Sequence, residues 1–200
     1  MLVTKIEKGK QHLSNIYIEG ELFASVDVDV LALYNLAEGV NIEKEQLEEL
    51  IEKSNDHRAY NKAIYFLGFR DYSTKDLRDK LKLTFPPENI DKAIEKLEKF
   101  KLIDDNKFAE KCARTLLFEK RFSKKKVKLE LVQKGIEKEF ASSVVDSLCF
   151  DLDEQDQIRF LISKKYKNAY TDEKTKRRAI AFLQRYGYSL EDIFSVLKEE

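Results

Sequence analysis

The chain has 200 residues, 42% hydrophobic and 37% charged, a composition that can bury a core and excludes a disordered protein. Six Gly, two Pro and no Trp leave few helix breakers, which argues against a multi-turn β sandwich. The formal net charge is zero, but residues 1–58 carry 6 basic and 12 acidic side chains and residues 59–150 carry 21 and 15, so the central part is basic.

Three short strands are predicted near the N-terminus, because apolar and polar residues alternate there with a period near two. Gly9 and Gly20 punctuate the alternating stretches. A meander of this size needs helices to cover its apolar face. We therefore expect residues 1–57 to form a small β-plus-α module, with strands at residues 2–8, 15–20 and 22–28 and helices at residues 30–38 and 43–53.

From Ala59 onward the pattern is purely helical and repeats with a period near 50 residues, the first helix being expected at residues 61–69. Each repeat can bury its apolar stripes only against its neighbours, so the sequence predicts a tandem array. The expected fold class is mainly α: three tandem three-helix repeats in an elongated array, preceded by the β-plus-α module. The repeats are placed at residues 58–101, 102–149 and 150–200.

Capping residues mark where the helices of the repeats begin and end. Ser73, Ser123 and Ser189 are N-cap candidates, and Gly135 and Gly187 each follow a helix end. Asp104 and the Thr171-Asp172-Glu173 segment are two further helix starts, and Pro87 suits a first helical turn. The predicted inward stripes are Leu77 and Leu81; Ile90, Ala93, Ile94 and Leu97; Phe108, Cys112 and Leu116; Val127 and Leu131; Phe140, Val144 and Leu148; Ile158, Leu161 and Ile162; Ile180 and Leu183; and Ile193, Val196 and Leu197.

Four short motifs lie in order along residues 59–198. They are Leu67-x2-Arg70-x2-Ser73-x3-Leu77-x2-Lys80-Leu81, then Leu102-Ile103-Asp104-Asp105-x2-Phe108-Ala109, then Glu130-Leu131-x2-Lys134-Gly135-Ile136, and last Phe182-Leu183-x-Arg185-Tyr186-Gly187-Tyr188. Together they resemble the motifs of the RecX family, the modulators of the RecA recombinase. The chain departs from the family pattern at residues 82–87 and at Lys101, where the family has glycine, and at Tyr186, where it has a basic residue.

The resemblance implies a non-enzymatic regulatory protein that binds the RecA–DNA filament, lying in its helical groove across several protomers. There it would inhibit or modulate strand exchange, ATP turnover and coprotease activity, in DNA repair and the SOS response. We expect a monomer whose partners are RecA, DNA or both. Two other functions stay open: a stand-alone nucleic-acid-binding protein, since the capped helix pairs resemble helix-turn-helix elements, and an α-repeat scaffold for another protein.

Basic residues gather in two places, each a candidate contact surface for the filament or for DNA. The first cluster has an alternative interpretation as a helix face that is merely exposed to solvent. If it instead contacts phosphates, binding to the filament or to DNA should weaken steeply as the salt concentration rises. Lys164, Lys165 and Lys167 form a smaller group, and nearby tyrosines could stack on bases or pack between repeats. Those tyrosines are Tyr166, Tyr170 and Tyr186. The candidate contact residues are Lys120, Arg121, Lys124, Lys125, Lys126 and Lys128 in the first cluster, and Lys174, Lys176, Arg177, Arg178 and Arg185 in the second.

The sequence predicts no catalytic site, cofactor or metal site. Asp104 and Asp105 are adjacent at a helix start, so capping is favoured over a pair of general acid and base. Arg70 is interpreted either as a partner contact or as a ligand of helix-end carbonyls. His12 and His57 have no second metal ligand within sequence reach, and no phosphate loop or nucleophile elbow occurs.

Cysteine usage and hydropathy indicate a reducing compartment. Cys112 and Cys149 form no C-x-x-C motif and are expected to be core thiols. The first ten residues lack the apolar stretch of a signal peptide, and no 18-residue apolar run occurs. We therefore expect a cytoplasmic protein without membrane contact.

Overall fold

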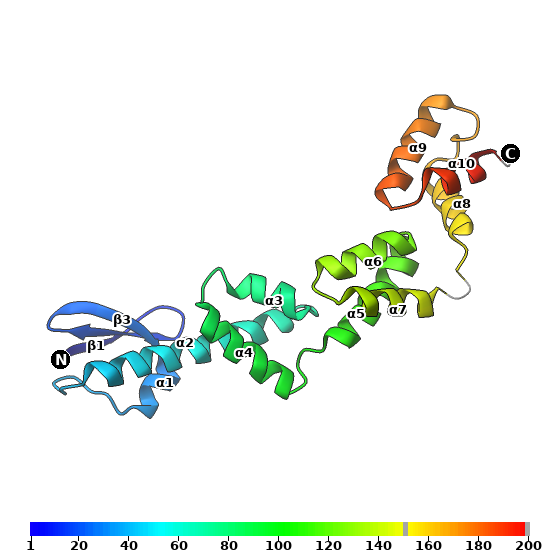
Figure 1. Cartoon of the computed structure of the whole chain (residues 1–200). Helices are drawn as coiled ribbons and strands as arrows, with labels where there is room; N and C mark the ends of the chain where they lie inside the picture. The colour runs from blue at the N-terminus through cyan, green and yellow to red at the C-terminus, as the bar shows by residue number, and fades with distance from the viewer. Residues whose placement is uncertain (150–151, 199–200) are drawn as a thin grey trace. The chain divides into compact units, whose positions relative to one another are not determined.

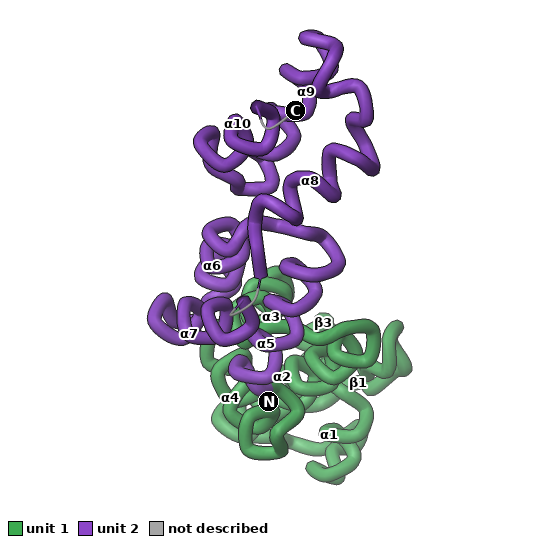
Figure 2. Tube along the Cα trace, turned by 90° about the vertical axis from the view of Figure 1, so that its right-hand side faces the viewer, with its two compact units in different colours: residues 1–103 green, residues 104–200 purple. Residues whose placement is uncertain are grey.

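The computed structural model describes residues 1–149 and 152–198, and it divides into two compact units, residues 1–103 (unit 1) and residues 104–200 (unit 2; Figure 2). The predicted class, mainly helical with a small N-terminal sheet, is confirmed. Unit 1 holds β1 (Val3–Lys8), β2 (Leu13–Ile18), β3 (Glu21–Asp27), α1 (Val28–Leu33), α2 (Lys44–Leu67), α3 (Thr74–Leu81) and α4 (Pro87–Lys99). Unit 2 holds α5 (Asp105–Arg114), a π-helical segment η1 (Thr115–Glu119), α6 (Lys124–Gln133), α7 (Lys138–Leu148), α8 (Glu154–Lys165), α9 (Glu173–Arg185) and α10 (Leu190–Lys198).

The three predicted strands form an antiparallel meander in the order β1-β2-β3. Ile6 pairs with Ile16, which in turn pairs with Ala24, so apolar side chains of all three strands share one face. Ile16 and Val26 are fully buried there, in one core with residues of α1 and of the first half of α2. Figure 1 shows these two helices beside the sheet.

Helix α1 is shorter than the predicted helix at residues 30–38. It begins after Asp27, whose side chain accepts a hydrogen bond from the backbone N–H of Asp29 at 3.0 Å. It ends at Leu33, and Asn35 follows with a φ of 49°. Asn tolerates this left-handed conformation, which stops the helix well before Gly39.

Helix α2 corrects a second prediction, because the helices expected at residues 43–53 and 61–69 are one continuous helix. The polar run between the two predicted helices is helical as well, and its side chains have partners. Ser54 is buried, and its Oγ accepts from the backbone N–H of Asp27 at 2.7 Å. Asp56 accepts from the Nδ2 of Asn89 on α4 at 2.7 Å. With no Gly or Pro in the run, the helix continues, and residues 57 and 58 both lie inside it.

Two clusters of apolar side chains fill unit 1, and α2 contributes to both. Leu47 and Leu50 pack in the core under the sheet, whereas Ala59 and Ala63 pack with α3 and α4. The stripe residues of α3 and α4 are buried, as predicted. The predicted cap of α3 is confirmed, since the Ser73 Oγ accepts from the backbone N–H of Asp76 at 3.1 Å. Pro87 is the first residue of α4, as predicted.

Unit 2 has one apolar cluster from α5, η1, α6 and α7 and another from α8, α9 and α10. The predicted caps Asp104 and Ser123 are confirmed, since their side chains accept from backbone N–H groups of the helix that follows. Asp172, predicted only to lie at a helix start, caps α9 in the same way. Ser189 does the same for the backbone N–H of Asp192 at 3.0 Å. Most predicted stripe residues of unit 2 are buried; Phe108, Cys112, Phe140, Leu148 and Ile180 are partly buried and pack against the two clusters.

The end of the first helix of unit 2 was not predicted. After Arg114 the helix widens into η1, which allows both Leu116 and Leu117 to be buried.

Cys112 is half-buried on this helix, and burial of Cys149 after α7 raises the pKa of its thiol. Neither cysteine forms a disulfide within the described residues, and both pack in or against the core, as predicted.

Within residues 1–149 and 152–198, no helix combines the length and the apolar character that crossing a membrane requires.

The core of α6 provides a first test of this structure. Leu131 is fully buried, so Leu131→Ala should lower the free energy of unfolding by about 2–5 kcal/mol through reduced burial and a residual cavity. Leu129 lies on the same helix with half of its side chain exposed, so Leu129→Ala should change this free energy by only about 0.5 kcal/mol. Urea unfolding followed by helical circular dichroism measures both, and equal losses of stability would contradict this assignment of faces.

Candidate functional site

The first basic cluster lies at the start of α6, and the turn after α9 packs against it. The backbone N–H of Ser123 donates to the carbonyl of Tyr186 at 3.0 Å, and the hydroxyl of Tyr188 donates to the carbonyl of Arg121 at 2.8 Å. The backbone N–H of Lys124 donates to the carboxylate of Glu154, the first residue of α8, at 2.6 Å. We call these contacts between residues 120–126 and the last three helices the junction.

Gly187 allows the two segments of the junction to approach closely. Its φ of 93° is a left-handed conformation that side chains rarely adopt. A Cβ at this position would also overlap the Oγ of Ser123 and the Cβ of Lys126. The residue that sequence analysis identified as a helix end therefore also forms a contact between the second and third groups of helices.

Arg121, a predicted contact residue, is held inside the junction. It has a φ of 56°, a left-handed conformation that costs a non-glycine residue roughly 1–2 kcal/mol. Its guanidinium lies 3.8 Å from the centroid of the Phe160 ring and donates to the Oε1 of Gln157 at 2.5 Å. These contacts keep Arg121 in place, so its main role in this structure is to join α8 to the start of α6.

Other basic residues of this cluster fall into two classes. Lys126 pairs with Glu130 at 2.8 Å, and Lys128 pairs with Asp146 of α7 at 2.8 Å. The hydrogen bond from Lys128 lowers the pKa of Asp146. By contrast, the side chains of Lys120 and Lys125 are exposed to solvent. The six charges of the sequence cluster are thus not equivalent, and the exposed lysines are the better candidates for contact with a partner.

The second predicted cluster lies entirely on α9. Arg177 pairs with Glu173 one turn earlier at 3.4 Å, and both are exposed. Arg178 and Arg185 line an open hollow of about 640 Å³, with Tyr166 and residues of α9 as its other walls. Lys174 is exposed and Lys176 is half-buried at the start of the helix. We call this space the α9 hollow.

A second hollow of about 490 Å³ lies at the junction, between residues of the first cluster and α8. Its walls include Lys120 and Arg121 from the first cluster and Tyr186 from the turn after α9. Phe160, Lys164 and Lys165 of α8 complete its cationic and aromatic lining. Sequence analysis had noted the two lysines as a small group but had missed Phe160, which no local pattern distinguishes from a core residue. We call this space the junction hollow.

The tyrosines near these lysines pack mainly against the core. Tyr166 and Tyr186 both contact the ring of Phe182, at centroid distances of 5.4 and 4.2 Å. Tyr170 packs against the same apolar cluster. Burial raises the pKa of the Tyr188 hydroxyl, a junction residue whose role was not predicted. The interpretation of packing between helices is therefore favoured for these rings.

The remaining motif residues have structural positions. The guanidinium of Arg70 lies 4.2 Å from the centroid of the Tyr72 ring, and a hydrogen bond with Tyr72 is the main cause of its raised pKa. Asp104 caps α5, and its bonds from backbone N–H groups, chiefly that of Lys107, lower its pKa. Asp105 is the first residue of the same helix, where a negative charge suits the helix dipole. Ala109 and Leu183 are fully buried and Phe182 is nearly so, whereas Leu67 and Phe108 are partly buried against the cores.

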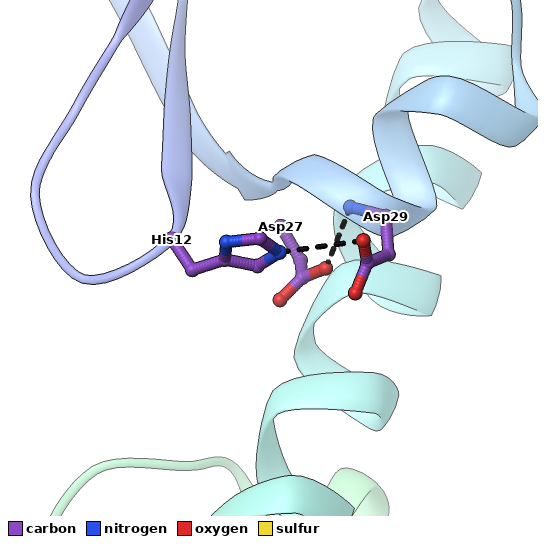
Figure 3. Close-up of side chains that lie close together, drawn as sticks. All are labelled: His12, Asp27 and Asp29. Carbon is purple, nitrogen blue, oxygen red and sulfur yellow. Dashed lines mark hydrogen bonds and ion pairs between the residues drawn. The ribbon is translucent and has the colours of Figure 1, made fainter.

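Among the described residues, one group of three His and Asp side chains lies close enough together to hold a metal ion, and it is in unit 1 (Figure 3). The spacing of these residues in the sequence does not indicate such a group. Ligand atoms of His12, Asp27 and Asp29 lie within 4.8 Å of one another. His12 approaches Asp29 at 3.3 Å, and the Nδ1 of His57 approaches Asp27 at 3.2 Å. These groups could hold a cation such as Zn²⁺. The contacts of Asp27 already have a structural role, however, because it caps α1 and joins it to α2.

Comparison with known proteins adds independent information about the helical region. Models of the first and third three-helix domains of RecX match residues 59–97 and 153–197. The chain is 27% identical to the regulatory protein RecX of Clostridioides difficile (strain 630) over 202 residues, covering 99% of this chain and 95% of that protein. It is 30% identical to the regulatory protein RecX of Clostridium tetani (strain Massachusetts / E88) over 207 residues, covering 98% and 93%.

Two solved structures resemble the chain. A crystal structure of regulatory protein RecX matches with a TM-score of 0.61 and 22% identity, covering 100% of this chain and 99% of that one, which shows the shared fold. A crystal structure of RecX from Lactobacillus salivarius matches with a TM-score of 0.57 and 26% identity, covering 72% of this chain and 96% of that one.

The junction leads to a test at Gly187. Gly187→Ala should combine the left-handed strain, roughly 1–2 kcal/mol, with overlap against Ser123 and Lys126, and should destabilise unit 2 by more than the strain alone. Gly39→Ala is the matched control, because Gly39 has a φ of 82° but open space around its Cβ position. The difference between the two variants in the free energy of unfolding, measured in urea, gives the cost of the overlap. If both variants lose the same stability, the junction does not need glycine for lack of space.

Proposed function

The chain belongs to the RecX family, and from this premise we propose that it is a non-enzymatic regulator that binds RecA–DNA filaments. It would inhibit or modulate strand exchange, ATP hydrolysis and coprotease activity, acting in the cytoplasm in DNA repair and the SOS response. The observation that carries the proposal is relatedness over nearly the whole length of proteins named regulatory protein RecX. Residues 58–101, 102–149 and 150–200 would serve as its three repeats.

The surface of unit 2 supports this proposal in chemical terms. A filament of protein on DNA presents phosphates and carboxylates, which exposed lysines and arginines can contact without burying a charge. Lys120, Lys125, Arg178 and Arg185 are basic side chains of this kind, three of them at the two hollows. The proposed contact surface therefore consists of these exposed residues, while Arg121, Lys126 and Lys128 hold the fold that presents them.

A second candidate is a nucleic-acid-binding protein that acts without RecA. The observation that favours it is the junction hollow, whose cationic and aromatic lining suits a nucleotide as well as a protein side chain. The two candidates differ in what must be present for binding. Co-sedimentation with RecA filaments, with the same DNA alone as the control, separates them.

The proposed function predicts an effect on RecA at stoichiometric amounts. Added to RecA on single-stranded DNA, the chain should change the rates of ATP hydrolysis and strand exchange, because a protein bound across several protomers restrains their movements. Steady-state ATPase and strand-exchange assays measure both rates. Unchanged rates at a 1:1 ratio to RecA would reject the proposed function, whatever the chain binds by itself.

The division of the basic cluster predicts which lysines matter in that assay. Lys120→Glu with Lys125→Glu should raise the concentration needed for half-maximal effect on RecA by roughly 3- to 30-fold, because two exposed attractive charges become repulsive. Lys80→Glu with Lys99→Glu makes the same charge change at exposed positions of unit 1 and should have a smaller effect. Circular dichroism should show unchanged helicity in both. If Lys120→Glu with Lys125→Glu acts on RecA at the same concentration as the unmodified chain, these lysines are only exposed to solvent and do not contact the filament.

A further inference from the structure

We propose that the junction hollow binds single-stranded nucleic acid, with Lys120, Lys164 and Lys165 on phosphates and one base against the ring of Phe160. This inference rests on the proposed function and deepens it, because it names the component of a RecA–DNA filament that this surface would contact. It is carried by three observations: the size and charge of the hollow, the exposed aromatic ring of Phe160 at its edge, and the α9 hollow beside it.

The size and charge of the hollow suit a nucleotide. Its volume of about 490 Å³ lies in the range of small-molecule sites, roughly 300–1,000 Å³. Among the described residues that line it, four are basic and one, Glu119, is acidic. The side chains of Lys120, Lys164 and Lys165 are exposed, so an incoming phosphate would meet charges that are already in water. Binding there avoids the cost of separating a buried ion pair.

Phe160 supplies an aromatic face at the edge of the hollow. Phe160 lies two residues after the fully buried Ile158 on α8, yet 40% of its surface is exposed. Arg121 lies over the ring at 3.8 Å from its centroid, and the Nζ of Lys164 lies 5.7 Å from the same centroid. An exposed ring with cations around it is the combination that proteins use to stack bases of single strands beside their phosphates.

The α9 hollow lies beside the junction hollow in unit 2. Lys165 and Tyr166 are consecutive residues that line different hollows, and so are Arg185 and Tyr186. The Nζ of Lys165 lies 4.5 Å from the centroid of the Phe182 ring, which itself contacts Tyr186. A strand leaving the junction hollow would therefore reach Arg178 and Arg185 next. Two neighbouring basic hollows with aromatic side chains between them fit a polymer of phosphates.

These features favour a single strand over the alternatives. The acidic side chains of a peptide such as polyglutamate would use the lysines but have no flat ring to stack on Phe160. A duplex hides the faces of its bases within the stack, so it could offer phosphates and base edges to the hollow but no base face to Phe160. The exposed bases of a single strand use both the charge and the aromatic surface.

The experiment measures binding of a fluorescent twelve-nucleotide oligothymidylate to the full chain, by anisotropy and without RecA. Lys164→Glu with Lys165→Glu should weaken binding at least tenfold and should reduce the slope of log K against log salt by about 0.7 for each phosphate that the variant no longer neutralises. The control, Lys80→Glu with Lys99→Glu, makes the same charge change away from the hollow and should weaken binding less than threefold. If both double variants bind the oligonucleotide equally weakly, the loss of affinity depends only on the net charge of the chain, and the proposed site is wrong.

A second comparison tests the base. Phe160→Leu should weaken binding of oligothymidylate by roughly 5- to 100-fold but leave binding of an abasic strand of equal length unchanged. Leu preserves an apolar contact for Arg121, and thermal unfolding should show that the variant is folded. Equal affinity of the unmodified chain for the two strands would overturn the stacking of a base on Phe160. Equal competition by polyglutamate would overturn the choice of a nucleic acid.

The outcome is independent of the RecA assays. If the chain modulates RecA but Lys164→Glu with Lys165→Glu binds the oligonucleotide normally, the site is wrong and the proposed function stands. If the oligonucleotide binds as described but RecA rates do not change, the site stands and the proposed function fails.

Discussion

The contact between the turn at Gly187 and the capped start of α6 determines how the second and third groups of helices are joined. Ser123 uses its Oγ to cap α6 and its backbone N–H to bond the carbonyl of Tyr186, so one residue satisfies polar groups of both segments. The bond to Tyr186 needs close approach of the two segments, which Gly187 allows, because a Cβ at that position would overlap the Oγ of Ser123. A hydrogen bond contributes about 1 kcal/mol, so the bond to Tyr186 adds to the packing that joins the two groups of helices, while the cap stabilises α6 itself by a similar amount.

The same contact decides which charges can meet a partner. Because the junction holds Arg121 over Phe160, the guanidinium is used for packing, and Lys126 and Lys128 pair with carboxylates of their own unit. The junction also brings α8 beside the start of α6, so lysines that are 40 or more residues apart in the chain line one hollow. A charge cluster in a sequence and a charged surface in a fold are therefore different sets of residues, and here they share only some members.

Local rules predicted most of the helices, because a cap or a stripe depends on residues within about one turn of each other. Ser73, Asp104, Ser123 and the buried stripes follow those rules, and they also carry the family motifs. The features that these rules did not predict depend on partners that are distant in the sequence. The polar run in α2 stays helical because Asp27 and Asn89 bond its side chains, and η1 widens to bury Leu117. His12, Asp27 and Phe160 acquire their surroundings from the fold, so no spacing in the sequence could show them.

A chain of zero net charge can bind an anionic polymer selectively if its basic residues are local. Screening at physiological salt limits each charge to about 8 Å, so a phosphate in a hollow responds to the charged side chains that line it more than to the net charge of the whole chain. Low net charge in turn reduces attraction to bulk duplex DNA, which binds basic proteins without regard to sequence. A regulator arranged in this way would be retained mainly where a partner presents anions and exposed rings together, and an extended strand in a protein filament meets that requirement better than a closed duplex does.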